Sequence, residues 1–183
     1  MPMSPTAVQL EDRLAEVLAA PAEVGTLDLL VCRPAKGERR LLESGLIDAE
    51  LGLVGDNWPT RPSRSTPDGR PDPAKQITVI SSRLSALLSP HPERRALTGD
   101  QLHVDLDLSV DNLPAGSRLA VGEAVLEISA APHRGCAVFV GHFGDDAMRF
   151  VNGGTGRALR LRGLNARVLT PGTVRVGDVV RKL

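Results

Sequence analysis

The tetrapeptide His133-Arg-Gly-Cys136 brings an imidazole, a guanidinium and a thiol together in the sequence. A cysteine reacts, or binds a metal, as its thiolate, and neighbouring positive charge favours that form. The alternative is a small buried residue, which is the usual role of a free cysteine between strands. Because the residues from Pro132 to Gly135 make the context polar, we favour a functional thiol. We expect Cys136 to be partly exposed at the mouth of a pocket, beside an arginine or a histidine.

Zinc binding is a second interpretation of the same residues. One His-x-x-Cys pair supplies two ligands, so Cys32, His103 and His142 would have to converge on it. The sequence contains no second close pair, which disfavours zinc. Cys32 ends an apolar segment and is expected in the core; a disulfide between Cys32 and Cys136 is conceivable and not preferred.

Glycines and arginines form the second candidate site, in Asn152-Gly-Gly-Thr-Gly-Arg157 and at Arg160, Arg162 and Arg167. Glycine lets backbone N–H groups approach an anion, and arginine binds phosphate through a planar pair of donors. We expect Arg160 and Arg162 to share one face of a strand. The alternative is a plain turn with solvated arginines. The segment lacks the Gly-Lys-Ser/Thr end of a Walker A loop and the parallel-sheet context of a dinucleotide-binding fingerprint.

The apolar pattern predicts many short strands and a few helices. Alternation with period two, or a short apolar run, predicts strands at 27–32, 76–80, 102–106, 118–121 and 125–128. Helices are predicted at 7–20, with Thr6 and Gln9 as a capping box, at 82–89 and at 145–151. Gly122-Glu123 and Gly177-Asp178 are typical of hairpin turns. No alternation of strand, helix and strand is visible, so we predict a mostly β, barrel-like fold with a few peripheral helices.

Residues 55–73 are expected to form a long loop, because five prolines and several charges leave little apolar surface to bury. Trp58 is expected to anchor the start of this loop. His91 and His103 are interpreted as structural, with His103 exposed on a strand.

Composition excludes several classes of function. Lys plus Arg and Asp plus Glu both number 22, which argues against a polycationic nucleic-acid-binding protein and against binding to an anionic membrane surface. Aromatic residues make up 2%, too few for a platform that stacks single-stranded nucleic acid. Two cysteines and no signal-peptide pattern lead us to expect a cytoplasmic protein.

Several motifs in order resemble the MOSC domain, the C-terminal domain of eukaryotic molybdenum cofactor sulfurases, which also occurs as small stand-alone bacterial proteins. They include Thr98-Gly-Asp-Gln-Leu, Pro132-His-Arg-Gly-Cys, Leu161-Arg-Gly-Leu-Asn-Ala-Arg-Val and Gly172-Thr-Val-Arg-Val-Gly-Asp-Val-Val. The resemblance covers residues 25–183, which we take as the domain, with residues 1–24 as an N-terminal helical arm.

The resemblance implies a barrel-like fold and binding of the pyranopterin of the molybdenum cofactor. It implies a sulfur carrier in which Cys136 holds a persulfide or ligates molybdenum, with His133 and Arg134 beside it. Cofactor binding is assigned to a larger set of residues: Arg160, Arg162, Gly153, Gly154, Gly156, Arg157 and Asn165. The chain has no aminotransferase-like domain and no context for a pyridoxal phosphate lysine. It would therefore need a cysteine desulfurase-type sulfur donor and a molybdoenzyme acceptor or redox partner.

Two alternatives stay open. The first alternative to the sulfur carrier is a component of a molybdenum-dependent reductase of N-hydroxylated compounds. The second is a non-catalytic pterin- or anion-binding module in which Cys136 only packs.

The composition of the long loop makes a prediction about its dynamics. Residues 59–73 should exchange their amide hydrogens faster than any other internal segment of the ligand-free protein, because few apolar contacts hold them. Hydrogen exchange measured by mass spectrometry tests this expectation. Strong protection of these amides without ligand would contradict it.

Overall fold

Strands close into a barrel in the part of the chain, residues 4–183, that this computed structural model describes. Seven strands follow one another in the order β11-β7-β8-β9-β5-β6-β1, and β1 pairs with β11 to complete the ring. Their bounds are β1 (Val24–Cys32), β5 (Ile77–Ser81), β6 (Leu102–Asp105), β7 (Arg118–Val121), β8 (Ala124–Ile128), β9 (Leu164–Thr170) and β11 (Val179–Lys182). The predicted barrel-like fold is confirmed.

Four more strands flank the barrel. β2 (Arg40–Leu42) pairs with the end of β1, while β10 (Gly172–Arg175), β3 (Ser44–Asp48) and β4 (Gly52–Leu53) form a second sheet. Alternating residues of the barrel strands fill its interior, as the pleat requires. Leu27, Val79, Leu102, Leu119 and Leu126 are all fully buried there.

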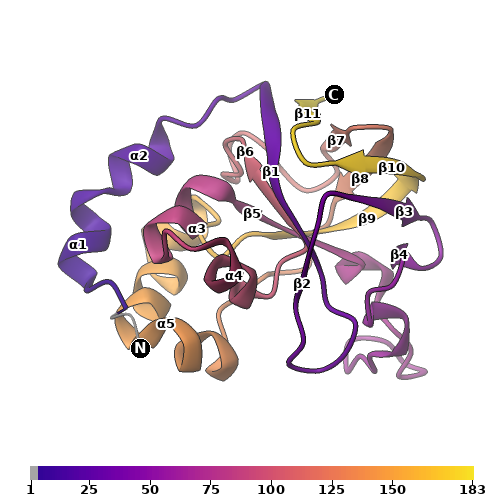
Figure 1. Cartoon of the computed structure of the whole chain (residues 1–183), viewed down its shortest axis with the longest axis horizontal. Helices are drawn as coiled ribbons and strands as arrows, with labels where there is room; N and C mark the ends of the chain where they lie inside the picture. The colour runs from indigo at the N-terminus through magenta and orange to yellow at the C-terminus, as the bar shows by residue number, and fades with distance from the viewer. Residues whose placement is uncertain (1–3) are drawn as a thin grey trace.

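The helices gather on one side of the barrel (Figure 1). They are α1 (Ala7–Asp12), α2 (Leu14–Leu18), α3 (Ser82–Leu88), α4 (Pro92–Arg95), α5 (Ala137–Asn152) and α6 (Gly154–Ala158). A second apolar cluster holds them together, with Leu10, Leu84, Phe139 and Phe143 at its centre. No helix within residues 4–183 is long and apolar enough to cross a membrane.

The predicted helix at 7–20 is two short helices, interrupted at Arg13. Its capping box is present: the Thr6 side chain accepts from Gln9 N–H, and the Gln9 side chain accepts from Thr6 N–H. The first three residues of the predicted arm lie outside the described residues.

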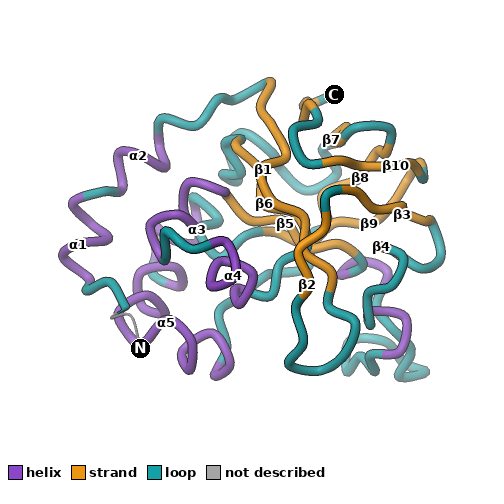
Figure 2. Tube along the Cα trace, viewed as in Figure 1, coloured by secondary structure: helices purple, strands orange, loops and turns teal. Residues whose placement is uncertain are grey.

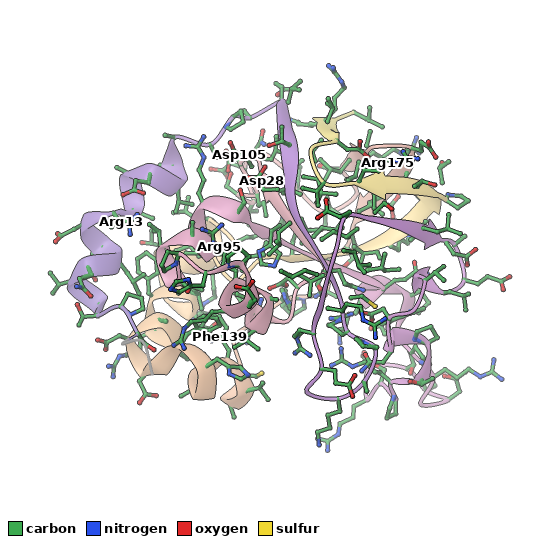
Figure 3. All side chains as sticks on the ribbon, in the orientation of Figure 1. Arg13, Asp28, Arg95, Asp105, Phe139 and Arg175 are labelled. Carbon is green, nitrogen blue, oxygen red and sulfur yellow. The ribbon has the colours of Figure 1, made fainter. Side chains whose placement is uncertain are left out.

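One strand–helix–strand unit is present that the sequence pattern did not reveal. β5 and β6 pair in parallel, and α3 and α4 make the crossover between them. Side chains tie the start of α3 to the barrel, because Ser82 Oγ donates to Asp28 and Arg83 donates to Asp105. Figure 3 shows Asp28 and Asp105 close together on the neighbouring strands β1 and β6.

His103 is fully buried, and the expectation of an exposed side chain was wrong. The barrel interior covers one face of β6 and α3 covers the other, so neither face meets solvent. His103 Nδ1 lies 3.0 Å from Ser85 Oγ, which itself donates to the Ser82 carbonyl, so Nδ1–H is the donor to Ser85. His103 Nε2 has no hydrogen-bond partner among residues 4–183.

The turn at Gly122-Glu123 joins paired strands, β7 and β8, as predicted. The hairpin expected at Gly177-Asp178 was wrong. A turn is present, but β10 pairs with β3 while β11 pairs with β1 and β7, so the chain passes there from one sheet to the other.

Residues 55–73 form the long loop that the composition predicts (Figure 2). Its only regular element is the 3₁₀ turn η1 (Trp58–Thr60), and Trp58 is buried, as expected. A second 3₁₀ turn, η2 (Pro73–Lys75), leads into β5, and a third, η3 (Ala96–Thr98), precedes β6. The mobility of residues 59–73 stays a prediction.

The buried His103 makes stability depend on pH. Burial lowers the pKa of His103 from its ordinary 6.5 to about 4. The unfolded chain therefore binds a proton that the folded chain does not, and stability is lost as pH falls from about 6.5 towards about 4. Between pH 7 and pH 5 this one group should lower the free energy of unfolding by about 2 kcal/mol.

Urea unfolding of wild type and His103→Gln at both pH values measures this effect. The variant should lose less stability on acidification than wild type, although burial also lowers the pKa values of His133 and His142 and leaves a residual dependence. His91→Gln, at an exposed loop position, is the matched control. An identical pH dependence in wild type and His103→Gln would contradict the assignment.

Candidate functional site

A cleft of about 930 Å³ opens at one end of the barrel, between the start of α5 and three loops. The loop after β1, the long loop 55–73, η3 and the turn before α5 line it, with Arg162 and Asn165 from the segment entering β9. Its size falls within the usual range of small-molecule sites.

Cys136 is exposed at this cleft and occupies the N-cap position of α5, where its side chain makes no capping hydrogen bond. As expected, Cys136 is exposed at the cleft, and His133 and Arg134 line the same cleft; the chemical roles expected of these residues stay predictions. Cys136 does not lie between two strands, because residues 137–143 are helical up to a kink at Gly144. The turn before it is held against α5, where Gly135 N–H donates to Asn152 Oδ1 at 3.0 Å.

A buried ion pair lies beneath the cleft. Asp100 is fully buried and accepts from Arg162 Nη1 and from His133, both at 2.7 Å. Burial alone would raise the pKa of Asp100, but the Arg162 guanidinium and His133 hold it well below its usual range. Arg162 also donates to the Thr98 carbonyl and lies over the Phe139 ring, 5.1 Å from its centroid. Its position is thus fixed from three sides.

His133 contacts both members of this ion pair. Its Nε2 lies 2.7 Å from Asp100 Oδ1 and 2.9 Å from Arg162 Nη1, and Nδ1 makes no hydrogen bond to residues 4–183. Burial lowers the pKa of His133 and the Arg162 guanidinium lowers it further, while Asp100 opposes them; the net lowering favours the neutral ring. His133 is thus held between the two charges at the cleft lining.

A second buried pair joins Arg33 to Asp56. Arg33 Nε and Nη2 donate to the two carboxylate oxygens at 2.8 Å each, and Arg33 Nη1 donates to the Gly99 carbonyl at 2.9 Å. Asp56 also accepts from the backbone N–H groups of Arg33 and Trp58. The pair fixes the start of the long loop against the end of β1. We name the two pairs, Arg33–Asp56 and Arg162–Asp100, the charged floor of the cleft.

Four further arginines line the cleft without a carboxylate partner among residues 4–183: Arg39, Arg61, Arg64 and Arg134. Burial lowers the pKa of Arg39 and of Arg61, and the Arg33 guanidinium lowers both further. Arg39 Nε is buried and makes no hydrogen bond in the described chain. Lys36, Arg64 and Arg134 add exposed positive charge to the cleft. The cleft is therefore suited to an anionic ligand.

The structure brings together five of the residues predicted for the site: Cys136, His133, Arg134, Arg162 and Asn165. The Asn165 amide donates to the carbonyls of Ala131 and Pro132, so it supports the turn that carries His133.

The other predicted residues lie outside the cleft lining. Gly154 and Gly156 belong to α6, and Gly153 ends α5. Arg157 donates to the Asn152 carbonyl, and Arg160 donates to the carbonyls of Leu108 and Leu113. Arg160 and Arg162 do not share a strand face: residues 159–162 form a turn in which Arg160 has a positive φ of 48°.

Sequence reasoning missed Arg33, Asp56, Asp100, Arg39 and Arg61. One signal was present, because Gly55-Asp56 and Gly99-Asp100 repeat the same dipeptide, and each aspartate holds a buried arginine. The ligands that a zinc site would need do not converge, since Cys32 and His103 are buried elsewhere. No group of three potential metal-binding side chains occurs within residues 4–183.

Removing the Asp100 charge should destabilise the protein. Asp100→Asn leaves the Arg162 guanidinium buried without a counter-charge, which costs about 3–5 kcal/mol in comparable pairs. Urea unfolding at pH 7 measures the loss, with the exposed Asp111→Asn as the matched control. Equal unfolding midpoints for the two variants would show that the Arg162–Asp100 pair does not stabilise the folded protein.

Comparison with solved structures shows similar folds at low sequence identity. YuaD from Bacillus subtilis superposes with a TM-score of 0.63 at 18% identity, covering 86% of this chain and 94% of that protein. YiiM from Escherichia coli gives 0.55 at 22% identity, covering 86% and 69%, and YiiM from Geobacillus stearothermophilus gives 0.54 at 14%, covering 90% and 74%. At these identities the likeness shows the fold. No curated protein matches the chain.

The sequence model of the MOSC domain matches residues 73–181, which is more than half of the chain. The matched region runs from η2 to β11 and contains the turn with Cys136 and the aspartate and arginine of the Arg162–Asp100 pair. By this match, and in agreement with the barrel and its cleft, the chain belongs to the MOSC domain family.

Proposed function

We propose that this protein is a sulfur carrier that binds the molybdenum cofactor in its cleft and holds sulfur as a persulfide on Cys136. The observation that carries the proposal is an exposed thiol at the mouth of a cleft lined by unpaired arginines. A thiol alone would fit many roles, and cationic lining alone would fit any anion. Together they suit a phosphorylated ligand whose other end reacts with sulfur.

The residues present fit the cofactor. Arg39 and Arg61 would hold its phosphate, because guanidinium groups bind phosphate through paired, charge-assisted hydrogen bonds. Asn57 Oδ1 and Thr98 Oγ1 are buried at the cleft without hydrogen-bond partners in residues 4–183, and they would pair with the polar edge of a pterin. When bound, the cofactor supplies a metal that accepts sulfur.

Cys136 would be loaded by a persulfide donor of the cysteine desulfurase type. The Cys136 thiolate attacks the outer sulfur of the donor persulfide, a new S–S bond forms, and the donor's own sulfur leaves as a thiolate. No electrons are gained or lost overall. The exposed position of Cys136 gives a donor protein access to it.

Binding and sulfur chemistry should separate in variants. Arg61→Gln should weaken binding of the isolated molybdenum cofactor by about one to two orders of magnitude, because a charge-assisted contact to phosphate contributes about 1.5–3 kcal/mol. Cys136→Ser should bind nearly as wild type but carry no persulfide. Fluorescence titration gives the affinities, and mass spectrometry after incubation with a persulfide donor gives the loading.

Arg157→Gln is the control, since Arg157 is exposed and lies outside the cleft lining. It should leave the affinity unchanged. If Arg157→Gln weakens binding as much as Arg61→Gln, the phosphate does not bind at Arg39 and Arg61 in the cleft. If Cys136→Ser weakens binding most, the thiol is part of the binding site and the proposed separation is wrong.

A further inference from the structure

Positive charge in the cleft exceeds what the protein itself neutralises. Asp56 and Asp100 are both engaged by the charged floor, through Arg33 and Arg162. Arg39 donates only to the Glu38 carbonyl, and Arg61 makes no side-chain hydrogen bond in residues 4–183. Burial lowers the pKa of Arg39, and repulsion from the guanidinium groups of Arg33 and Arg61 lowers it further. A bound anion would offset both costs.

The thiol of Cys136 lies within electrostatic range of this charge. A negative charge on Cys136 raises the pKa of Arg61, opposing the larger effects of burial and of Arg33. The Cys136 side chain is exposed, and its thiol makes no hydrogen bond to residues 4–183. A nucleophile in this position faces a surface that attracts anions, so an anionic sulfur compound would gather where the thiol can attack it.

We propose that the cleft accepts a small dianionic sulfane-sulfur donor, of which thiosulfate is the simplest, and that Cys136 takes its outer sulfur. This inference rests on the proposed sulfur-carrier function and names a substrate class for the same site. The Cys136 thiolate attacks the outer sulfur of thiosulfate, forming the Cys136 persulfide. The S–S bond of thiosulfate breaks, and its electron pair leaves with sulfite, so atoms and charge balance without an added oxidant or reductant.

Arg39 and Arg61 would do two things in this step. In water, a thiolate and a dianion repel each other, and the two guanidinium charges offset that repulsion. They would also stabilise sulfite, which leaves as a dianion. Because the same arginines would hold the cofactor phosphate, sulfite must leave before the cofactor binds. The cleft would therefore work by successive displacement, with inorganic phosphate competing against thiosulfate.

The experiment is to incubate the purified full chain with thiosulfate and to measure intact mass and released sulfite. Wild type should gain the mass of one sulfur atom at Cys136 and release an equal amount of sulfite, and Cys136→Ser should do neither. Arg39→Gln and Arg61→Gln should load at least about tenfold more slowly, because each loses a charge-assisted contact. Arg61→Lys, which keeps the charge, should recover part of the rate.

Arg70→Gln is the matched control, because Arg70 belongs to the same long loop but is exposed and does not line the cleft. It should load at the wild-type rate. Equal loading of Arg61→Gln and wild type, or slowing of Arg70→Gln to the same degree, would overturn the role of the cleft arginines. A small organic persulfide without an anionic headgroup is the second donor: Cys136 attacks its outer sulfur, the S–S bond breaks and the organic thiolate leaves. Its rate should depend on Arg39 and Arg61 less than the thiosulfate rate does.

The two donors also separate this inference from the proposed function. If the organic persulfide loads Cys136 and thiosulfate does not, the sulfur carrier stands and the anionic donor is wrong. If neither of these donors nor a protein persulfide loads Cys136, both the anionic-donor inference and the proposed sulfur-carrier function fail. Loading by thiosulfate that depends on Arg39 and Arg61 supports both the sulfur-carrier function and the anionic donor.

Discussion

The two buried aspartate–arginine pairs fix the site. A buried charge is costly unless it is paired and hydrogen-bonded, so each pair ties together the segments that supply its members. Arg33 at the end of β1 holds Asp56 in the long loop, and Arg162 before β9 holds Asp100 after η3. The bond from Arg33 to the Gly99 carbonyl links the two pairs. Loops from distant parts of the chain thereby meet at one end of the barrel.

This arrangement divides the cations of the cleft into two groups. Those of the charged floor are neutralised and serve the fold, while Arg39 and Arg61 remain available to a ligand. The floor also positions His133, because Asp100 and Arg162 both contact its Nε2 beside the turn that presents Cys136. Phe139 of α5, labelled in Figure 3, connects the cleft to the helices. It packs in the helical apolar cluster, and the Arg162 guanidinium lies over its ring.

The barrel was predictable because strand alternation is a local property, and the strands predicted at 27–32, 76–80, 102–106, 118–121 and 125–128 are present as β1, β5, β6, β7 and β8. The exposed Cys136 was predictable from the polar residues before it. The second part of the helix that follows was predicted at 145–151, but its first part was missed. Ala137-Val-Phe-Val suits a strand or a helix, and packing of Phe139 and Phe143 in the helical apolar cluster favours the helix. The arginines at 160 and 162 were assigned to one face by strand spacing, and the positive φ values of Arg160 and Gly163 break that spacing. Arg39 and Arg61 are far apart in sequence from Cys136, so only the folded chain could bring them together.

The most direct test of the account is the state of Cys136 in protein purified from a host that makes the molybdenum cofactor. Intact-protein mass spectrometry and molybdenum quantification on the same sample measure it. The account predicts a fraction of chains with one extra sulfur atom, removed by a thiol reductant and absent from Cys136→Ser. Stoichiometric molybdenum with no extra sulfur on Cys136 would contradict it and favour the reductase alternative, in which the thiol ligates the metal.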